Sequence, residues 1–232
     1  MSAALRWLPQ GTVYGALLNF RREWDLWAPQ MAQAPYKAAP QAPVLYIKTA
    51  NTFAPCGAAI AVPDEVDVGA TLGLVIGGFE EKLPPALAES AQAATKKEAG
   101  GLHRIAGCVL LNDLSRPHAS YYRPPIKFRN RDGFLGCGPV LQAVPDLSTL
   151  ALELRINGTL AQRIELSTLV RDAATLLRDV SEFTTLQAGD VLMLGTDCLP
   201  DGTRPRAKAG DRIEISAPGF APLVNTLVED AA

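Results

Sequence analysis

The sequence is poor in the residues from which metal and disulfide frameworks are built. It contains four cysteines, at positions 56, 108, 137 and 198, with no C-x-x-C pair, and only two histidines. This spacing argues against a structural zinc site. It favours four reduced thiols in a cytosolic protein.

Long apolar runs and an excess of charge of one sign are also missing. No apolar run approaches the length of about 20 residues that a membrane-spanning helix needs, and Met1–Pro9 has no sustained apolar core of a signal peptide. Lys and Arg total 22 against 24 Asp and Glu, which gives no electrostatic case for nucleic acid. We therefore expect a soluble, cytoplasmic protein that binds neither nucleic acid nor membrane.

What the sequence does contain is a series of short segments with the character of β-strands. The 232 residues, 48% of them hydrophobic, are enough for one large domain with a full core. We expect strands at residues 12–19, 44–48, 58–62, 71–76, 105–111, 152–156, 159–164, 191–195, 212–216 and 222–228. Asn157-Gly158 predicts a type I′ hairpin between two of them.

Helical patterns are fewer. We expect a turn or two of helix at 20–27, a helix at 81–100, and another that Ser167 caps and that continues to Leu177. Residues 28–43, rich in Ala, Pro and Gln, predict a lid-like loop. The fold class is therefore α+β and mostly β, in a single domain over 1–232, with an N-terminal strand and lid-like segment (1–43) and a core (44–232).

Polar residues at the end of one apolar run are the first candidates for chemistry. Asp113 follows the buried run at 105–111, where its carboxylate is suited either to a hard cation such as Mg²⁺ or to capping a turn. His118 titrates in the range useful for acid–base catalysis, although a loop histidine is usually only solvated. Glu23, beside Trp24, has the same two readings, a proton carrier or a solvated side chain.

The segment 115–134 carries further candidates. Tyr122 and Arg123 are suited to lining a cleft for an anion or to anchoring a loop by aromatic burial. The run Arg129-Asn130-Arg131-Asp132-Gly133-Phe134 suits either carboxylate binding or a charged hairpin turn.

These segments, in their order along the chain, resemble the fumarylacetoacetate hydrolase family. The motifs that carry the resemblance are Leu18-Asn19-Phe20, Tyr46-Ile47-Lys48, 72–77 (L-G-L-V-I-G), 112–115 (N-D-L-S), 131–134 (R-D-G-F), Gly189-Asp190 and Leu194-Gly195-Thr196. They span nearly the whole chain. The resemblance is closest to the N-terminal half of members that isomerise and decarboxylate intermediates of 4-hydroxyphenylacetate degradation, in which two such domains occur as a tandem or as two subunits.

The resemblance implies a mixed β-roll with a few peripheral helices and a metal at one mouth. Mg²⁺ or Mn²⁺ is held in the family by two glutamates of an E-x-E strand and the aspartate of N-D-x-S, and no organic cofactor is implied. Asp113 matches the aspartate, whereas the E-x-E positions are Gly69 and Thr71. The family's early histidine corresponds to Glu23, and its K-x-x-D lysine to Arg129.

Three functions are compatible with this pattern. The first is an isomerase/decarboxylase subunit for a small dicarboxylate or tricarboxylate. In it the catalytic side chains would be Glu23, His118, Lys127 and Arg129, and the substrate-binding ones Tyr122, Arg123, Arg131, Asp132 and Thr196. The second is a metal-poor half that completes a homodimer or a hetero-oligomer with an E-x-E-bearing sister subunit. The third is a related hydrolase or lyase for another oxo-acid.

Overall fold

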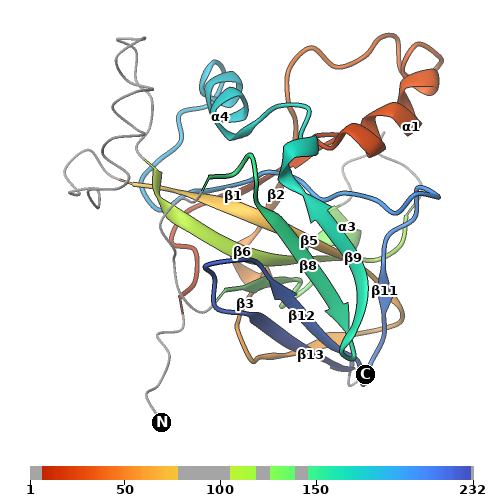
Figure 1. Ribbon diagram of the computed structural model, residues 1–232, viewed down its shortest axis with the longest axis vertical. Coiled ribbons are helices and arrows are strands. Elements are labelled where there is room, and N and C mark those ends of the chain that lie inside the picture. The colour runs from red at the N-terminus through yellow and green to blue at the C-terminus, as the bar shows by residue number, and fades with distance from the viewer. Residues whose placement is uncertain (1–6, 78–104, 119–125, 139–145, 231–232) are drawn as a thin grey trace.

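The computed structural model describes residues 7–77, 105–118, 126–138 and 146–230. Within these ranges the protein consists mainly of two β-sheets with small helices at the periphery (Figure 1). The α+β, mostly β fold class is therefore confirmed. The helix expected at 81–100 lies outside the described residues.

The larger sheet holds eight strands among the described residues and is mixed. Its order is β2-β1-β10-β5-β6-β7-β3, and β11 pairs with β5 at one end. The strands are β1 (Val13–Leu17), β2 (Val44–Lys48), β3 (Phe53–Pro55), β5 (Val66–Ile76), β6 (Ile105–Ser115), β7 (Leu135–Cys137), β10 (Val191–Met193) and β11 (Arg206–Ala207).

In the described part of the chain the second sheet holds five strands, in the order β4-β13-β12-β8-β9. They are β4 (Ala59–Val62), β8 (Ala151–Ile156), β9 (Thr159–Glu165), β12 (Arg212–Ser216) and β13 (Leu223–Glu229). The hairpin predicted between β8 and β9 is confirmed, because Asn157 and Gly158 both have the positive φ that a type I′ turn requires.

The helices lie outside the sheets, and α1 (Arg21–Met31) and α4 (Ala173–Ser181) are at the same end of the molecule (Figure 1). The described residues also include a single helical turn, α3 (Ile126–Arg129), and 3₁₀ turns at Ala50–Thr52 and Leu166–Thr168. Helix α1 is longer than expected and includes the first residues of the predicted loop. The cap predicted at Ser167 is wrong, because Asp172 accepts the hydrogen bond from the Thr175 N–H at the start of α4.

Strands β5 and β6 form the longest pairing in the larger sheet. Both strands have 11 residues, which is longer than either predicted segment. Gly69 pairs with Asp113, and Thr71 pairs with Leu111. Asp113 therefore lies inside a strand, and the prediction that it follows the strand, with a turn-capping role as one alternative, is wrong.

The two faces of the larger sheet bury different sets of side chains. One face packs against the second sheet in a core that includes Leu72, Leu110 and Leu152. The opposite face carries a smaller apolar cluster around Val109, Leu111 and Met193. Asp113 follows Leu111 by two residues, and alternate residues of a strand share a face. Its carboxylate therefore lies at the end of the smaller cluster.

Tyr46 crosses the smaller cluster because Gly15, its partner on β1, has no side chain. The Tyr46 ring occupies the space in which a Cβ at residue 15 would lie. Tyr46 is only 8% exposed. The glycine therefore lets the phenol reach from an outer strand toward the centre of the sheet.

Gly15→Ala should displace this ring. We expect the variant to lose about 1–3 kcal/mol of unfolding free energy, the usual range for overpacking a close-packed site. Urea denaturation measures the loss. In a double-mutant cycle with Tyr46→Ala, the two losses should be less than additive, because both act on the same contact. Additive losses would contradict this account of Gly15.

Candidate functional site

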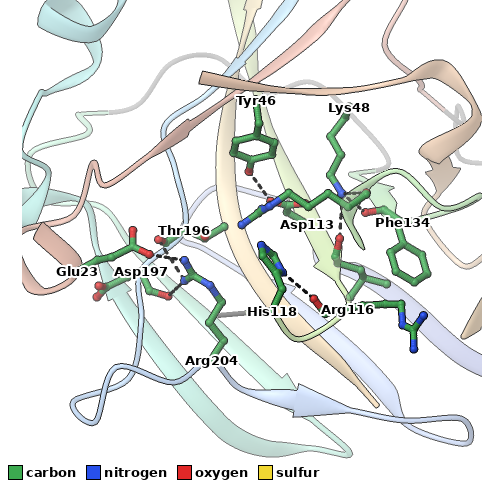
Figure 2. Close-up of polar contacts among 12 residues, drawn as sticks. Glu23, Tyr46, Lys48, Asp113, Arg116, His118, Phe134, Thr196, Asp197 and Arg204 are labelled. Atoms are coloured by element: carbon green, nitrogen blue, oxygen red, sulfur yellow. Dashed lines mark hydrogen bonds and ion pairs between the residues drawn. The ribbon is translucent and has the colours of Figure 1, made fainter. Parts of the chain in front are cut away.

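The carboxylate of Asp113 is buried among three polar side chains (Figure 2). Lys48 Nζ lies 2.7 Å from Oδ1, and Arg129 Nη1 lies 3.2 Å from Oδ2. The Tyr46 hydroxyl donates to the same Oδ2. We call these four residues the Asp113 cluster; each of them is less than 9% exposed.

Lys48 is held by the backbone as well as by the carboxylate. Its ammonium group donates to the carbonyl oxygens of Leu114, Arg129 and Phe134 at 2.6–2.9 Å. These acceptors come from the end of β6, from α3 and from the residue that precedes β7. The lysine therefore ties the edge strand β2 to the segment that carries Arg129.

Arg129 completes the cluster from the last residue of α3. Its guanidinium carbon lies 4.4 Å from the centroid of the Tyr46 ring, in cation–π geometry. Its Nε is buried and has no hydrogen-bond partner among the described residues. The side chain is thus held between the ring and the carboxylate.

The charges in the cluster shift one another's pKa values. Burial disfavours the ionised form of Asp113, but Lys48 and Arg129 outweigh it and hold the pKa of this carboxyl below its ordinary value. Burial lowers the pKa of Lys48 to about 8, against the opposing effect of Asp113. Burial and the neighbouring carboxylate raise the pKa of Tyr46. Asp113 is therefore ionised at neutral pH, with its charge compensated inside the protein.

The residues at the E-x-E positions do not supply the missing ligands of a divalent cation. Gly69 has no side chain, and a Cβ there would lie 2.5 Å from the Thr196 methyl group, which occupies that space. Thr71 offers only a hydroxyl group. Mg²⁺ and Mn²⁺ favour several carboxylate oxygens. Because the one carboxylate present is already paired with two cations, this donor set does not fit the metal that the resemblance implies.

The rest of the described chain agrees with this conclusion. No group of three or more His, Cys, Asp or Glu side chains that could hold a metal ion occurs in the described ranges. Asp67 shares the row of Gly69 and Thr71 on β5, but it lies opposite Ser115 and pairs with Arg206 rather than joining Asp113. It does not replace the absent glutamates.

A second buried ion pair lies beside the first cluster. Glu23 of α1 accepts from Arg204 Nη2 at 2.6 Å and from the Leu18 N–H at 3.2 Å. Arg204 also donates to the backbone carbonyl of Asp197 at 2.9 Å. In Figure 2 this group lies to the left of His118, and the Asp113 cluster lies above His118. Glu23, which occupies the position of the family's histidine, is therefore held in an ion pair with Arg204.

An open cleft of about 470 Å³ lies at this mouth of the larger sheet. Its polar lining includes Asp67, His118, Thr203, Arg204 and Arg206. The imidazole of His118 stacks on Phe128 with ring centroids 5.2 Å apart, and Nδ1 lies 2.8 Å from the Arg116 carbonyl oxygen. Burial lowers the pKa of His118.

The other residues predicted for the site lie apart from one another. Lys127 is exposed on α3, although its neighbour Arg129 is buried. Arg131 pairs with Asp230 at the surface, and Asp132 accepts from the Asn51 amide. Tyr122 and Arg123 fall outside the described residues. Of the residues predicted for the site, Asp113 and Arg129 are in direct contact. Glu23, His118 and Thr196 lie near the neighbouring cleft (Figure 2).

The sequence reasoning missed the partners of the predicted residues. Tyr46 and Lys48 are two residues apart on β2, so their side chains lie on the same face of the strand. A lysine on the same face as an aromatic residue in an otherwise apolar strand was the sequence feature that could have predicted a buried polar contact. Arg204 stands in a Pro-rich segment with no periodic pattern, and nothing local marks it as the partner of Glu23.

Adding Mg²⁺ or Mn²⁺ should leave the stability of this chain unchanged. A ligand that binds only the folded state raises the melting temperature by mass action, and the Asp113 cluster offers no such binding. The measurement is thermal unfolding with 5 mM of either ion (roughly the upper end of useful concentrations for a weak site) and with chelator. An increase of several degrees in the melting temperature that chelator reverses would refute the conclusion that the Asp113 cluster does not bind a metal ion.

Asp113→Ala should lower the unfolding free energy by about 3–5 kcal/mol, because it leaves Lys48 and Arg129 buried without a counter-charge. The pKa of Asp113 is lower in the folded state, so its contribution is present above the unfolded value of about 3.9 and is lost as the pH falls through the folded pKa. Urea denaturation at pH 7 and in acid measures both effects.

The matched control is Asp230→Ala. Its carboxylate is 36% exposed and pairs with Arg131 at the surface, so we expect a loss below about 1 kcal/mol. Equal losses in the two variants would refute a special role for Asp113.

Comparison with known proteins identifies the family of this chain. The model of the fumarylacetoacetate (FAA) hydrolase C-terminal family matches residues 12–228. The 4-hydroxyphenylacetate degradation bifunctional isomerase/decarboxylase of Escherichia coli is 38% identical over 224 residues, which are 95% of this chain and 48% of that protein. The chain therefore spans about half the length of that relative.

Solved structures show the same fold. The 5-carboxymethyl-2-hydroxymuconate delta-isomerase of Mycobacterium smegmatis superposes with a TM-score of 0.70 at 25% identity, covering 99% of this chain and 83% of that one. The maleylpyruvate hydrolase of Sphingobium sp. SYK-6, solved with manganese(II) and pyruvate, superposes with a TM-score of 0.66 at 19% identity, covering 96% and 72%.

No helix in the described ranges is long and apolar enough to cross a membrane. The family model covers nearly the whole chain. The matched residues include the N-D-x-S aspartate and the residues that line the cleft. The chain belongs to the fumarylacetoacetate hydrolase family.

Proposed function

We propose that this chain is a subunit of an isomerase/decarboxylase assembly in 4-hydroxyphenylacetate degradation. The substrates would be 2-hydroxyhepta-2,4-diene-1,7-dioate and 5-oxopent-3-ene-1,2,5-tricarboxylate. The 38% identity to a bifunctional relative, over only 48% of that relative's length, supports both the pathway and the need for a second domain. The partner would be a second domain of the same family.

The observation that carries the proposed role is the internal compensation of Asp113 by Lys48 and Arg129. A carboxylate already paired with two buried cations offers little to a metal ion or to a substrate. The chemistry that needs a divalent cation therefore belongs to a sister domain with both E-x-E glutamates. This chain completes and stabilises the assembly.

The cleft supports a second candidate, in which this chain moves a proton itself. In a neutral imidazole, an Nδ1–H that donates to the Arg116 carbonyl leaves Nε2 as the acceptor nitrogen. The lowered pKa of His118 favours this neutral form near pH 7. His118 would take the proton of the C2 enol hydroxyl of 2-hydroxyhepta-2,4-diene-1,7-dioate and return it to C5, at the far end of the diene, which is an isomerisation to the conjugated ketone.

A reconstitution experiment tests the proposed function. We expect this chain to form a stable complex with an E-x-E-bearing sister domain, detected by size-exclusion chromatography with light scattering. Isomerase and decarboxylase activity should require the sister domain. Full activity of this chain alone, or no complex at micromolar concentrations, would refute the subunit role.

A histidine variant separates the two candidates. His118→Gln keeps a polar side chain of similar size but cannot act as a base. If the sister domain carries all the chemistry, the complex formed with this variant should keep the wild-type kcat. A loss of 100-fold or more, roughly the contribution of a general base, would instead assign proton transfer to this chain.

A further inference from the structure

The cleft contains an ion pair that has no part in the Asp113 cluster. Strand β11 pairs with the start of β5, so that Arg206 and Asp67 are direct backbone partners. Arg206 Nε lies 3.3 Å from Asp67 Oδ1, and its Nη1 lies 2.9 Å from Glu65 Oε2. Both Arg206 and Asp67 line the cleft.

These contacts hold the arginine loosely. The Nε–Oδ1 distance is long for a charge-assisted hydrogen bond. The Arg206 and Glu65 side chains are 47% and 50% exposed, and ion pairs that face water in this way contribute little. The guanidinium group can therefore exchange its present partners for another carboxylate at small cost.

Asp67 has the opposite character. Its side chain is 14% exposed, and it is the single acidic residue among the described lining residues, which include the two arginines Arg204 and Arg206. Burial raises the pKa of Asp67, against the effect of both arginines. A ligand carboxylate would therefore compete with Asp67 and with the water-exposed Glu65 for Arg206.

We propose that Arg206, with Asp67 as its resident counter-ion, is a carboxylate-binding residue of this cleft. The ligand class is a small dicarboxylate, one end of which binds Arg206 in exchange for Asp67 and Glu65. Arg204, fixed by Glu23 and by the Asp197 carbonyl, is a second guanidinium group in the lining, and its charge is paired with Glu23.

The inference deepens the proposed function and rests on it for the choice of ligand. It places the ligand contact at Asp67 of β5. Asp67 is two residues before Gly69, the first of the two positions at which the family has a glutamate. Alternate residues of a strand are about 7 Å apart along it, so this contact lies one step away from Gly69.

Calorimetric titration of the purified chain with pimelate, the saturated seven-carbon dicarboxylate, tests the assignment. We expect binding at low ionic strength. Arg206→Gln should weaken it about tenfold, as expected for one charge-assisted hydrogen bond. Asp67→Asn should tighten it about threefold or more, because it removes the competing charge. The two variants act in opposite directions, so a general loss of folding cannot mimic the result.

The matched control is Arg212→Gln on β12. Arg212 is 49% exposed and pairs with Glu214, so the variant removes the same charge from a similar setting away from the cleft lining. It should leave the dissociation constant for pimelate unchanged. An equal weakening by Arg212→Gln would refute a local contact.

Two further outcomes would also overturn the proposal. One is weaker pimelate binding in Asp67→Asn. The other is binding of 1,5-diaminopentane but not of pimelate, which would make the cleft a cation site. If pimelate fails to bind while the complex with the sister domain still forms, this inference fails and the proposed function stands.

Discussion

The pairing of one buried carboxylate with two buried cations governs the arrangement of this end of the protein. Asp113 needs a positive charge because burial alone would force it to the neutral form, and Lys48 and Arg129 meet that need from β2 and α3. The same lysine binds three backbone carbonyl groups. Removing the carboxylate would therefore loosen the edge strand and the single helical turn together.

Glycines make this pairing sterically feasible. Gly15 leaves the space across which Tyr46 reaches Asp113, and Gly69, directly opposite Asp113, leaves space that the Thr196 methyl group fills. Because Thr196 fills the space at Gly69, the cleft begins two residues away along β5, at Asp67. The packing of Tyr46 on Gly15 and of Thr196 on Gly69 thus determines both where the Asp113 cluster lies and where the cleft begins.

Local features of the fold were predictable from the sequence, and long-range contacts were not. The turn at Asn157-Gly158 and the bounds of β2 follow from neighbouring residues alone. Ser167 misled because it lies in a separate 3₁₀ turn, and the residue that caps α4 is Asp172. The pairing of Asp113 with Lys48 joins strands that are distant in the sheet, and no local pattern encodes that distance.

The filled space at Gly69 has a consequence for any redesign of this site. A glutamate at this position would collide with Thr196, and its charge would lie beside a carboxylate that Arg129 and Lys48 already neutralise. A glutamate introduced at residue 69 alone would thus give a less stable protein unless Thr196 moved. A carboxylate at residue 69 would require Gly69 and Thr196 to change together, because the two residues share one space.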